Sequence, residues 1–385
     1  MQQDVFCARP FEFFEVDAEG AAWVCCQDWL DTSIGDLRTQ SLMEVWNSPV
    51  AQDIRRSILD GSFEYCNHNT CPKIVSNSLV KIENLTNPYR KKIAAERPLV
   101  LETGPITLNL GYDNSCNLSC RSCRPHLIVL QGDEFAIAEI MQKKVLAEGF
   151  SNAKRAIITG HGDALASKLF RQLLRELDAK QYPDLRIDLM TNGLLFTSAM
   201  WESFARCHKA IRSVSISIDA ATEATYKINR SNGDFQKLLR NLEFIGTLRT
   251  SEKISFYEIS FVVQQNNYGE MKSFTELGRR LSCDTVLFQK IINWGCGTYN
   301  EAQFKEVAVH EPQHPEHLAF KEVLKDPIFG DPIVTEARLR QPFYRAEAYH
   351  QRYAATHPND AYIVINDVPK LHRLQRLFPS LFRTP

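Results

Sequence analysis

Apolar and polar positions follow two different periods along the chain, and the change of period divides it into three parts. Between residues 106 and about 293, short apolar runs typical of buried strands alternate with longer stretches of helical period. The expected strands are ITLNLGY (106–112), RAIITG (155–160), LRIDLMT (185–191), SVSISID (213–219), ISFYEISFVV (254–263) and DTVLFQKII (284–292). This repetition predicts an α/β fold with a parallel sheet covered by helices, either an open doubly wound sheet or a partial barrel.

Residues 1–95 have the pattern of a separate small unit. Two apolar runs in FFEVDAEGAAWVCC flank a turn signal at residues 17–20, which predicts a hairpin. The following stretch, SLMEVWNSPVAQDIRRSILDG, has helical period. Ser41 is placed to cap this helix, with Glu44 at the third helical position of a capping box. Residues 96–105 are expected to connect this unit to the barrel.

After residue 293 the pattern becomes irregular, and we expect residues 294–385 to form a C-terminal extension that covers the active site. A late strand, AYIVIND (361–367), precedes a basic helical stretch, PKLHRLQRLF, which is typical of a solvated helix face. The His/Pro-rich stretch HEPQHPEH holds His310, His314 and His317. Its prolines and irregular spacing favour a solvated loop over a metal site.

Composition narrows the class of protein. Apolar residues make up 44% of the 385 residues, charged residues 24%, and the formal net charge is −1. These values are typical of a soluble globular protein and give no reason to expect a nucleic-acid partner. The sequence shows neither a run of 18 apolar residues nor a signal-peptide pattern, so we expect a cytoplasmic protein with no membrane segment. Eleven cysteines in such a protein indicate metal ligation more than disulfides.

Three of these cysteines, Cys116, Cys120 and Cys123, lie within eight residues directly after the first barrel strand. A structural zinc site normally has four protein ligands. Three thiolates in one loop suit a [4Fe–4S] cluster whose fourth iron stays open for a small chelating ligand. A zinc site that borrows a ligand from elsewhere in the chain is the alternative.

The motif CNLSCRSC resembles the CxxxCxxC signature of the radical S-adenosylmethionine (radical SAM) superfamily. Further stretches resemble family segments in the same order: TGHGDALAS (159–167), TNG (191–193), SISID (215–219) and TYKINRSNG (225–233). The resemblance covers about residues 106–293. It implies a partial (β/α)6 barrel, a catalytic [4Fe–4S] cluster, SAM, and a reducing electron donor such as flavodoxin or ferredoxin.

The resemblance also implies contacts to SAM after the second, third and fourth strands. The residues at these positions are Gly160, Gly162, Asp163, Asn192, Ser217, Asp219 and, further along, Arg230. Taken alone, the residues also fit plainer roles. The glycine turn can be an ordinary βα turn capped by Asp163, and Ser217 or Asp219 can cap the next helix.

The remaining amino-terminal cysteines are Cys7, Cys25, Cys26, Cys66 and Cys71. Their layout resembles the SPASM-type module, which implies a second, auxiliary [4Fe–4S] cluster. Five thiols exceed the four positions of a cubane cluster, so one of the adjacent pair Cys25 and Cys26 is expected to be spare. We favour Cys7, Cys26, Cys66 and Cys71 as ligands. A structural zinc site with the same ligands is the alternative.

The last three thiols fall on opposite sides of the predicted sheet. Cys207 and Cys283 precede strands four and six, which places them away from the chemistry and favours packing roles. Cys296 follows strand six and is expected near the site of radical formation. We hypothesise that it returns a hydrogen atom to a substrate radical; an incidental loop thiol is the alternative.

The resemblance implies cleavage of SAM to a 5′-deoxyadenosyl radical and removal of hydrogen from a C–H bond of a small-molecule or peptide substrate. Cys296 favours epimerisation, for example of a carbohydrate or another small natural product. The alternatives are oxidation or cross-linking of a ribosomally made peptide and, outside enzymes altogether, a non-catalytic zinc-binding interaction protein.

Overall fold

A computed structural model of the chain describes residues 4–158, 162–293, 299–329 and 337–338. These residues belong to a compact unit of residues 1–339, and a second unit comprises residues 340–385. The late strand and basic helix expected after residue 360 lie outside the described residues.

The six expected barrel strands are all present, and they pair with one another in parallel. They are β6 (Thr107–Leu110), β7 (Arg155–Ile158), β8 (Arg186–Thr191), β9 (Ile211–Ser217), β10 (Phe256–Val263) and β11 (Thr285–Lys290). In the sheet they follow one another in sequence order. This arrangement confirms the predicted partial barrel.

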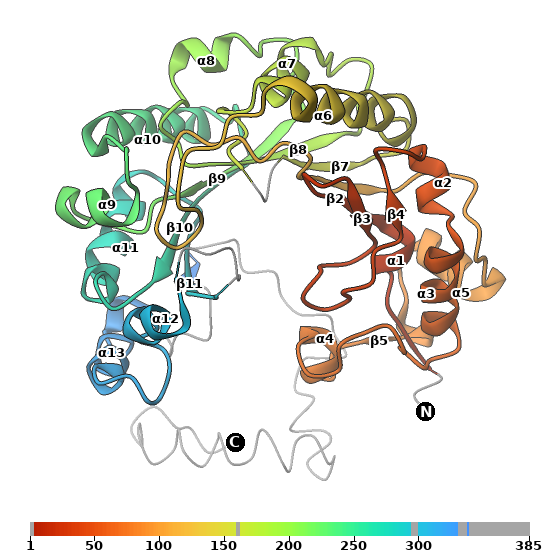
Figure 1. Ribbon diagram of the computed structural model, residues 1–385, viewed down its shortest axis with the longest axis horizontal. Helices are drawn as coiled ribbons and strands as arrows, with labels where there is room; N and C mark the ends of the chain where they lie inside the picture. The colour runs from red at the N-terminus through yellow and green to blue at the C-terminus, as the bar shows by residue number, and fades with distance from the viewer. Residues whose placement is uncertain (1–3, 159–161, 294–298, 330–336, 339–385) are drawn as a thin grey trace, which may run out of the picture. The chain divides into compact units, whose positions relative to one another are not determined.

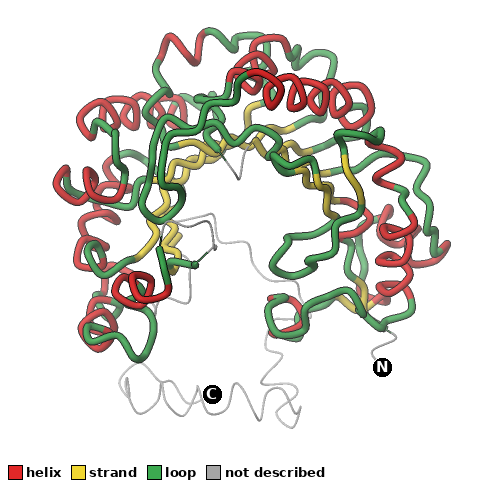
Figure 2. The backbone as a smooth tube through the Cα atoms, viewed as in Figure 1, coloured by secondary structure: helices red, strands yellow, loops and turns green. Residues whose placement is uncertain are grey.

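The two faces of the barrel strands differ in burial. One face is fully buried, as Leu108, Ile216 and Ile259 illustrate. Alternate positions are more accessible, so Met190 is 44% exposed and the other inner positions are mostly half-buried and polar. The helices lie outside the curved sheet and the strands line its inner side (Figure 2). The inner face therefore carries the more accessible and more polar side chains of the sheet.

The helices of the barrel occupy the expected stretches between the strands. They are α6 (Gly132–Lys144), α7 (Lys168–Glu176), α8 (Ser198–Glu202), α9 (Glu223–Asn229), α10 (Phe235–Thr250) and α11 (Met271–Arg280). Four of them begin at a side-chain cap that accepts a backbone N–H: Ser167, Thr197, Thr222 and Asp234. Polar residues at these helix starts satisfy N–H groups that have no partner inside the helix.

The amino-terminal residues form the predicted hairpin from β2 (Phe13–Val16) and β3 (Ala21–Trp23). Asp17 accepts the Ala21 N–H at 2.9 Å, and Gly20 takes a positive φ of 83° in the turn. The strand β4 (Gly35–Asp36) extends the hairpin. A separate pair, β1 (Val5–Phe6) and β5 (Val80–Lys81), forms a small antiparallel sheet.

The helix expected after Ser41 is divided into α2 (Leu42–Trp46) and α3 (Pro49–Leu59). Ser41 and Glu44 form the predicted capping box. The chain breaks because Pro49 has no backbone N–H for a continuing helix, and Ser48 caps the new one. The other helices of this region are α1 (Arg9–Glu12), α4 (Pro72–Val75) and α5 (Pro88–Glu96).

The amino-terminal unit is joined to the barrel through the sheet itself. Strand β2 lies parallel to β6, with Glu15 in register with Asn109. The ten-stranded sheet therefore runs β12–β11–β10–β9–β8–β7–β6–β2–β3–β4, with the hairpin at one end (Figure 1). This pairing places the cysteine-rich unit directly beside the strand that leads into the Cys116 loop.

Beyond β11 the described chain holds two short helices, α12 (Glu301–Val307) and α13 (His317–Val323). The strand β12 (Ala337–Arg338) pairs antiparallel with β11. Among the described residues, no helix has the length and apolar character needed to cross a bilayer.

Candidate functional site

The loop that carries Cys116, Cys120 and Cys123 starts at the carboxyl end of β6. The backbone N–H of Cys116 bonds the carbonyl oxygen of Ile128 at 2.8 Å, and that of Cys123 bonds the carbonyl oxygen of Cys120 at 2.9 Å. These bonds fold the loop back on itself. Cys116 and Cys120 are buried, whereas Cys123 is exposed. The loop therefore presents one thiol toward solvent and holds two inside.

Each of the three sulfurs faces an N–H donor. Asn192 Nδ2 lies 3.9 Å from the sulfur of Cys116, and Arg230 Nη1 lies 3.6 Å from that of Cys120. Arg124 directs both Nε and Nη2 at the sulfur of Cys123, each at 3.4 Å. Such donors are typical of the surroundings of metal-bound thiolates, because they stabilise negative charge on sulfur.

Burial raises the pKa of the Cys116 and Cys120 thiols. Desolvation, together with the nearby Asp163 carboxyl, raises the pKa of Cys116 to about 11. A thiol of this kind stays protonated at neutral pH unless a metal displaces its proton. Donors aimed at the sulfurs therefore fit metal-bound thiolates better than free thiols.

Two buried polar atoms beside Cys120 have no hydrogen-bond partner among the described residues. They are Nε of Arg230 and the hydroxyl of Tyr226. Arg230 is 8% exposed and Tyr226 is fully buried, so both groups are shielded from bulk water. A buried donor without a partner is costly. Both donors fit a ligand that brings acceptor atoms next to Cys120, as a cluster with bound SAM would.

Within the part of the chain that the structure describes, no three His, Cys, Asp or Glu side chains converge on a point that a single metal ion would occupy. A cubane cluster makes a different demand, since its irons are held by separate thiolates. Cys116, Cys120 and Cys123 are the thiols that the loop offers to such a cluster.

The turn after β7 packs closely against the cysteine loop. A Cβ atom on Gly162 would lie 2.7 Å from the carbonyl oxygen of Ser115 and 2.8 Å from the carbonyl carbon of Asn114. The next residue, Asp163, donates its backbone N–H to the same Ser115 oxygen at 2.8 Å. Glycine is needed here because any side chain would push the loop away. Gly160 lies outside the described residues.

The carboxylate of Asp163 is fully used by protein donors. One oxygen accepts Leu165 N–H at 2.9 Å and Ala166 N–H at 3.0 Å. The other accepts the Thr191 hydroxyl at 2.8 Å and Asn192 N–H at 2.6 Å. Asp163 thereby ties the turn after β7 to the segment after β8. This arrangement favours a positioning role for Asp163 over the direct SAM contact expected from the sequence.

Asn192 continues this connection to the cysteine loop. Its Nδ2 lies 2.9 Å from Oδ1 of Asn117, in addition to its approach to Cys116. The side chain is buried. Asn192 therefore joins the end of β8 to the loop that follows β6.

The end of β9 brings a second network to the same loop. Asp219, at a positive φ of 62°, accepts the Val262 N–H at 2.8 Å and forms an ion pair with Arg230 at 2.7 Å. Both side chains are buried. Asp219 therefore orients Arg230 toward Cys120. The contact of Asp219 with SAM, expected from the sequence, stays a prediction. Ser217 is half-buried at the end of β9, and its contact with SAM stays a prediction.

The amino-terminal cysteines separate into a group of four and a single residue. Burial and the neighbouring thiols of Cys7, Cys25 and Cys71 raise the pKa of Cys66 to about 12. Burial also raises the pKa of Cys25, to about 11, and Cys7 adds to this shift. Cys25 thus lies among the other thiols of the unit.

Cys26 has different neighbours. Burial raises its pKa, and the charged groups near it are Asp28, Glu15 and Arg9. Its side chain lines a cavity of about 830 Å³ that also contains Cys123. The sequence favoured Cys26 as an auxiliary ligand, but the geometry favours Cys25, because Cys25 lies near Cys7 and Cys66 whereas Cys26 lines the cavity.

The remaining cysteines and histidines considered in the sequence analysis have structural roles where the structure describes them. Cys207 and Cys283 are buried in the core, as their packing role requires. The expectation of a solvated histidine loop is wrong for His314, which is 8% exposed and has Nε2 3.0 Å from the Glu306 carbonyl oxygen. That contact fixes a turn. Cys296 lies outside the described residues.

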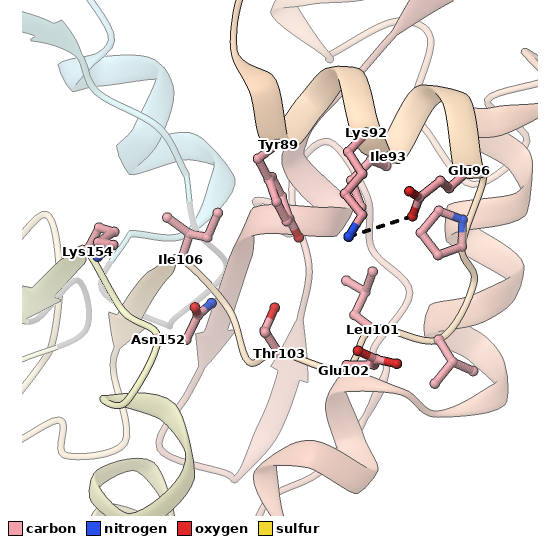
Figure 3. Close-up of a pocket in the computed structure, with 12 residues that line it drawn as sticks. Tyr89, Lys92, Ile93, Glu96, Leu101, Glu102, Thr103, Ile106, Asn152 and Lys154 are labelled. Carbon is pink, nitrogen blue, oxygen red and sulfur yellow. Dashed lines mark ion pairs between the residues drawn. The ribbon is translucent and has the colours of Figure 1, made fainter.

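A second cavity, of about 550 Å³, lies at the opposite ends of the strands. Figure 3 shows Tyr89 and Lys92 on one side of it, with Asn152 and Lys154 across from them. Ile106 and Lys154 precede β6 and β7, which places this cavity at the amino-terminal edge of the sheet. In parallel α/β folds the chemistry lies at the other edge.

Known families match three separate stretches of the chain. Residues 113–252 match the radical SAM superfamily, and residues 7–72 match an iron–sulfur cluster-binding domain of the SPASM type. Residues 113–252 therefore carry a radical SAM domain, and residues 7–72 carry a SPASM domain ahead of it. These two domains imply [4Fe–4S] clusters and SAM as cofactors.

A third match concerns the end of the chain. Residues 297–380 match the peptide methionine sulfoxide reductase family. A reductase of this name from Mesorhizobium japonicum is 43% identical over 58 residues, which are 15% of this chain and 30% of that protein. One from Trichodesmium erythraeum is 36% identical over 82 residues, or 20% and 46%. The chain thus spans less than half the length of these curated relatives.

Sequence reasoning missed this third match and treated the segment as an irregular extension. The cluster of aromatic and charged residues in PFYRAEAYHQRYAATHP (342–358) was the available signal. These residues lie outside those that the structure describes.

Two solved structures show partial similarity to this chain. Streptococcus suis SuiB bound to its precursor peptide SuiA is 14% identical, with 70% of this chain and 60% of that one covered and a TM-score of 0.40. The protein anSMEcpe with bound AdoMet and a peptide is 22% identical, with 47% and 49% covered and a TM-score of 0.34.

Proposed function

We propose that this protein is an enzyme that uses SAM and a reduced cluster at Cys116, Cys120 and Cys123 to abstract hydrogen from a substrate C–H bond. The observation that carries this proposal is that three residues, Asn192, Arg230 and Arg124, direct N–H donors at the three loop sulfurs. When bound, the cluster and SAM would supply a 5′-deoxyadenosyl radical. An external one-electron donor, such as flavodoxin or ferredoxin, would reduce the cluster.

The residues around the loop have distinct tasks in this proposal. Arg124, Arg230 and Asn192 stabilise negative charge on the thiolates. Asp219 holds Arg230 in place, and Asp163 fixes the segments on which the donors sit. The Tyr226 hydroxyl and Arg230 Nε, which have no partner among the described residues, are available to acceptor groups of the bound cofactors. The chain thereby prepares the charge distribution before the reaction begins.

The fate of the substrate radical is the finer part of the proposal. We favour epimerisation of a small natural product, with Cys296 returning a hydrogen atom to the opposite face. A Cys296→Ala variant should then lose the inverted product. If that variant still inverts its substrate, the hydrogen comes from another group.

A second outcome is oxidation or cross-linking of a peptide. The four-thiol group of Cys7, Cys25, Cys66 and Cys71 supports it, because an auxiliary cluster there would be able to accept the electron of the substrate radical. We further propose the three-part division at residues 1–95, 106–293 and 294–385, and a cytoplasmic location, where thiols stay reduced.

Anaerobic protein treated with dithionite and SAM tests the radical reaction without knowledge of the substrate. The wild type should form 5′-deoxyadenosine, which chromatography with mass detection measures. Cys120→Ala should form none, and Cys207→Ala, which removes a core thiol away from both cysteine groups, should retain the activity. Equal product from Cys120→Ala and the wild type would refute the assigned site.

A further inference from the structure

A third cavity, of about 840 Å³, lies at the amino-terminal edge of the sheet, beside the starts of β8, β9 and β10. Its lining comes from three chain segments, within residues 179–186, 205–212 and 252–255. Its volume falls within the range of small-molecule sites. The loop with Cys116 follows the carboxyl end of β6, so the cavity lies at the opposite edge from the proposed radical chemistry. A ligand in this cavity would therefore be separate from SAM and from the substrate.

Backbone hydrogen bonds hold these three segments side by side. The N–H of Ile187 bonds the carbonyl oxygen of Ala210 at 2.8 Å, and the N–H of Ser255 bonds that of Arg212 at 2.8 Å. The segments lead into three successive parallel strands, and neighbouring strands lie about 4.8 Å apart. The backbones at the first and third strand starts are therefore about 10 Å apart. Side chains from all three can reach one extended ligand.

The charged side chains that line this cavity are mostly cations. Among the described residues of the lining, Glu252 brings the single carboxylate. One cation, Arg212, is paired with Asp188. Four further cations are exposed and form no ion pair within the described part of the chain: Lys180, Arg186, Lys209 and Lys253. The lining therefore has a clear excess of positive charge.

Carboxylates just outside the cavity do not remove this excess, because each already pairs with other cations. The pairs are Asp178 with Arg206, Asp184 with Lys154, and Asp188 with both Arg155 and Arg212. Lys180 and Arg186 lie near the first two of these carboxylates without forming an ion pair with them. Glu252 also lies near Arg249, outside the lining. The positive charge is therefore a local feature, since the whole chain has a formal net charge of −1.

Arg186 is held in a position from which it can bind an anion. Its Nη1 donates to the carbonyl oxygens of Pro183 and Leu185, at 2.8 and 2.9 Å, which fixes the guanidinium beside the cavity. Its Nε and Nη2 donate to no acceptor among the described residues. A guanidinium with a fixed plane can donate to two phosphate oxygens at once. The side chains of Tyr182 and Ser255 also line the cavity and add hydroxyl donors.

We propose that this cavity binds a small molecule that carries a linear diphosphate or triphosphate group. Arg186 binds the oxygens of one phosphate. Lys209 and Lys253, in the segments that lead into β9 and β10, and Lys180 neutralise the neighbouring phosphates. Several cations around one concave surface attract a polyanion more strongly than a singly charged ligand. The site takes no part in the radical reaction.

Isothermal titration calorimetry with sodium tripolyphosphate tests this site on the anaerobic, cluster-loaded, full-length protein. We expect one saturable site per chain at physiological ionic strength. The affinity should fall as salt is added, because the contacts are ionic and exposed.

Two variants and one control assign the binding to the cavity. Arg186→Gln and Lys209→Gln should each weaken tripolyphosphate binding by about tenfold, because each removes a charged donor. Lys143→Gln removes a cation from α6, where the lysine side chain is 68% exposed, and should leave the affinity unchanged. Thermal unfolding of all three variants checks that the fold is retained.

A titration with ATP separates two sources of the same chemistry. Binding of ATP that is tighter than that of tripolyphosphate, and that Arg186→Gln weakens, would identify the ligand as a nucleotide. Binding of ATP that is no tighter would show that the phosphate chain alone is recognised. Either result supports the site.

The absence of saturable binding by both probes would overturn the proposal. So would a loss of affinity in Arg186→Gln and Lys209→Gln no larger than that in Lys143→Gln. The titration needs no turnover, so its outcome is independent of 5′-deoxyadenosine formation. A protein that forms 5′-deoxyadenosine but binds neither probe would keep the radical function and lose this site.

Discussion

The guanidinium of Arg230 reaches the sulfur of Cys120 across 110 positions of the sequence, with Nη1 and Sγ 3.6 Å apart. The same guanidinium forms an ion pair with Asp219 at 2.7 Å. Both partners are buried, so the charge near the sulfur is poorly screened. This relationship links the end of β9 to the electronic properties of the cysteine loop.

Replacing Arg230 should therefore make the catalytic cluster harder to reduce. A nearby cation stabilises the more negative, reduced state, so Arg230→Gln should lower the midpoint potential by on the order of tens of millivolts. Redox titration followed by electron paramagnetic resonance measures it. Arg230→Lys, which keeps the charge, should shift the potential less, and the exposed Arg240→Gln should not shift it. An unchanged potential in Arg230→Gln would contradict this role.

The contact between Gly162 and the loop predicts a sharp difference between two glycines. A Cβ atom at position 162 would meet backbone atoms, whereas one at Gly269 would meet nothing within 4 Å. Gly162→Ala should lower the free energy of unfolding by about 1–3 kcal/mol, because the loop must move. Gly269→Ala should be nearly neutral. Denaturant unfolding compares them, and similar stability of both variants would show that the close contact is absent.

We predict that Arg55 contributes strongly to the stability of the amino-terminal unit. It is fully buried, and its guanidinium donates to the carbonyl oxygens of Pro10, Trp46 and Leu99 at 2.7–3.1 Å. Arg55→Met should leave these acceptors unpaired and cost about 3 kcal/mol or more.

The adjacent Arg56 is the natural control, because its side chain is 54% exposed and pairs only with Asp53 among the described residues. Arg56→Met should change the free energy of unfolding by less than about 1 kcal/mol. Thermal unfolding of both variants measures the difference. Comparable losses would show that burial of Arg55 contributes little.

The adjacent cysteines of the hairpin should differ in their effect on iron content. Cys25 lies beside Cys7 and Cys66, whereas Cys26 lines the cavity. Cys25→Ala should therefore lose the auxiliary cluster, about four irons per chain. Cys26→Ala should retain them. Iron analysis of anaerobically purified protein decides between the two, and the reverse pattern would restore Cys26 as the ligand.

The parallel barrel and the cysteine loop could be predicted because their signals are local. Alternating strands and helices, and three thiols in one loop, are visible in short stretches of sequence. Local sequence signals could not decide whether Cys25 or Cys26 is the ligand. Neighbouring residues share the same spacing pattern, and only the three-dimensional course of the hairpin separates their side chains.

Long-range pairing explains the other differences between the structure and the predictions made from the sequence. Nothing in the sequence near β2 indicates that it pairs with β6, about 90 residues later, because strand partners are chosen by packing across the whole sheet. The roles of Asp163 and Asp219 depend on donors that come from three other segments. A motif identifies such residues. Only the fold shows whether their side chains contact a cofactor or instead position the loop that binds the cofactor.

The most direct test of the account is the metal content of anaerobically purified protein and two alanine variants, Cys120→Ala and Cys66→Ala. Two cubane clusters predict about eight irons, with matching sulfide, in the wild type. Each variant should retain about four. A wild-type protein with stoichiometric zinc and no iron would contradict both cluster assignments and indicate a metal-stabilised binding protein.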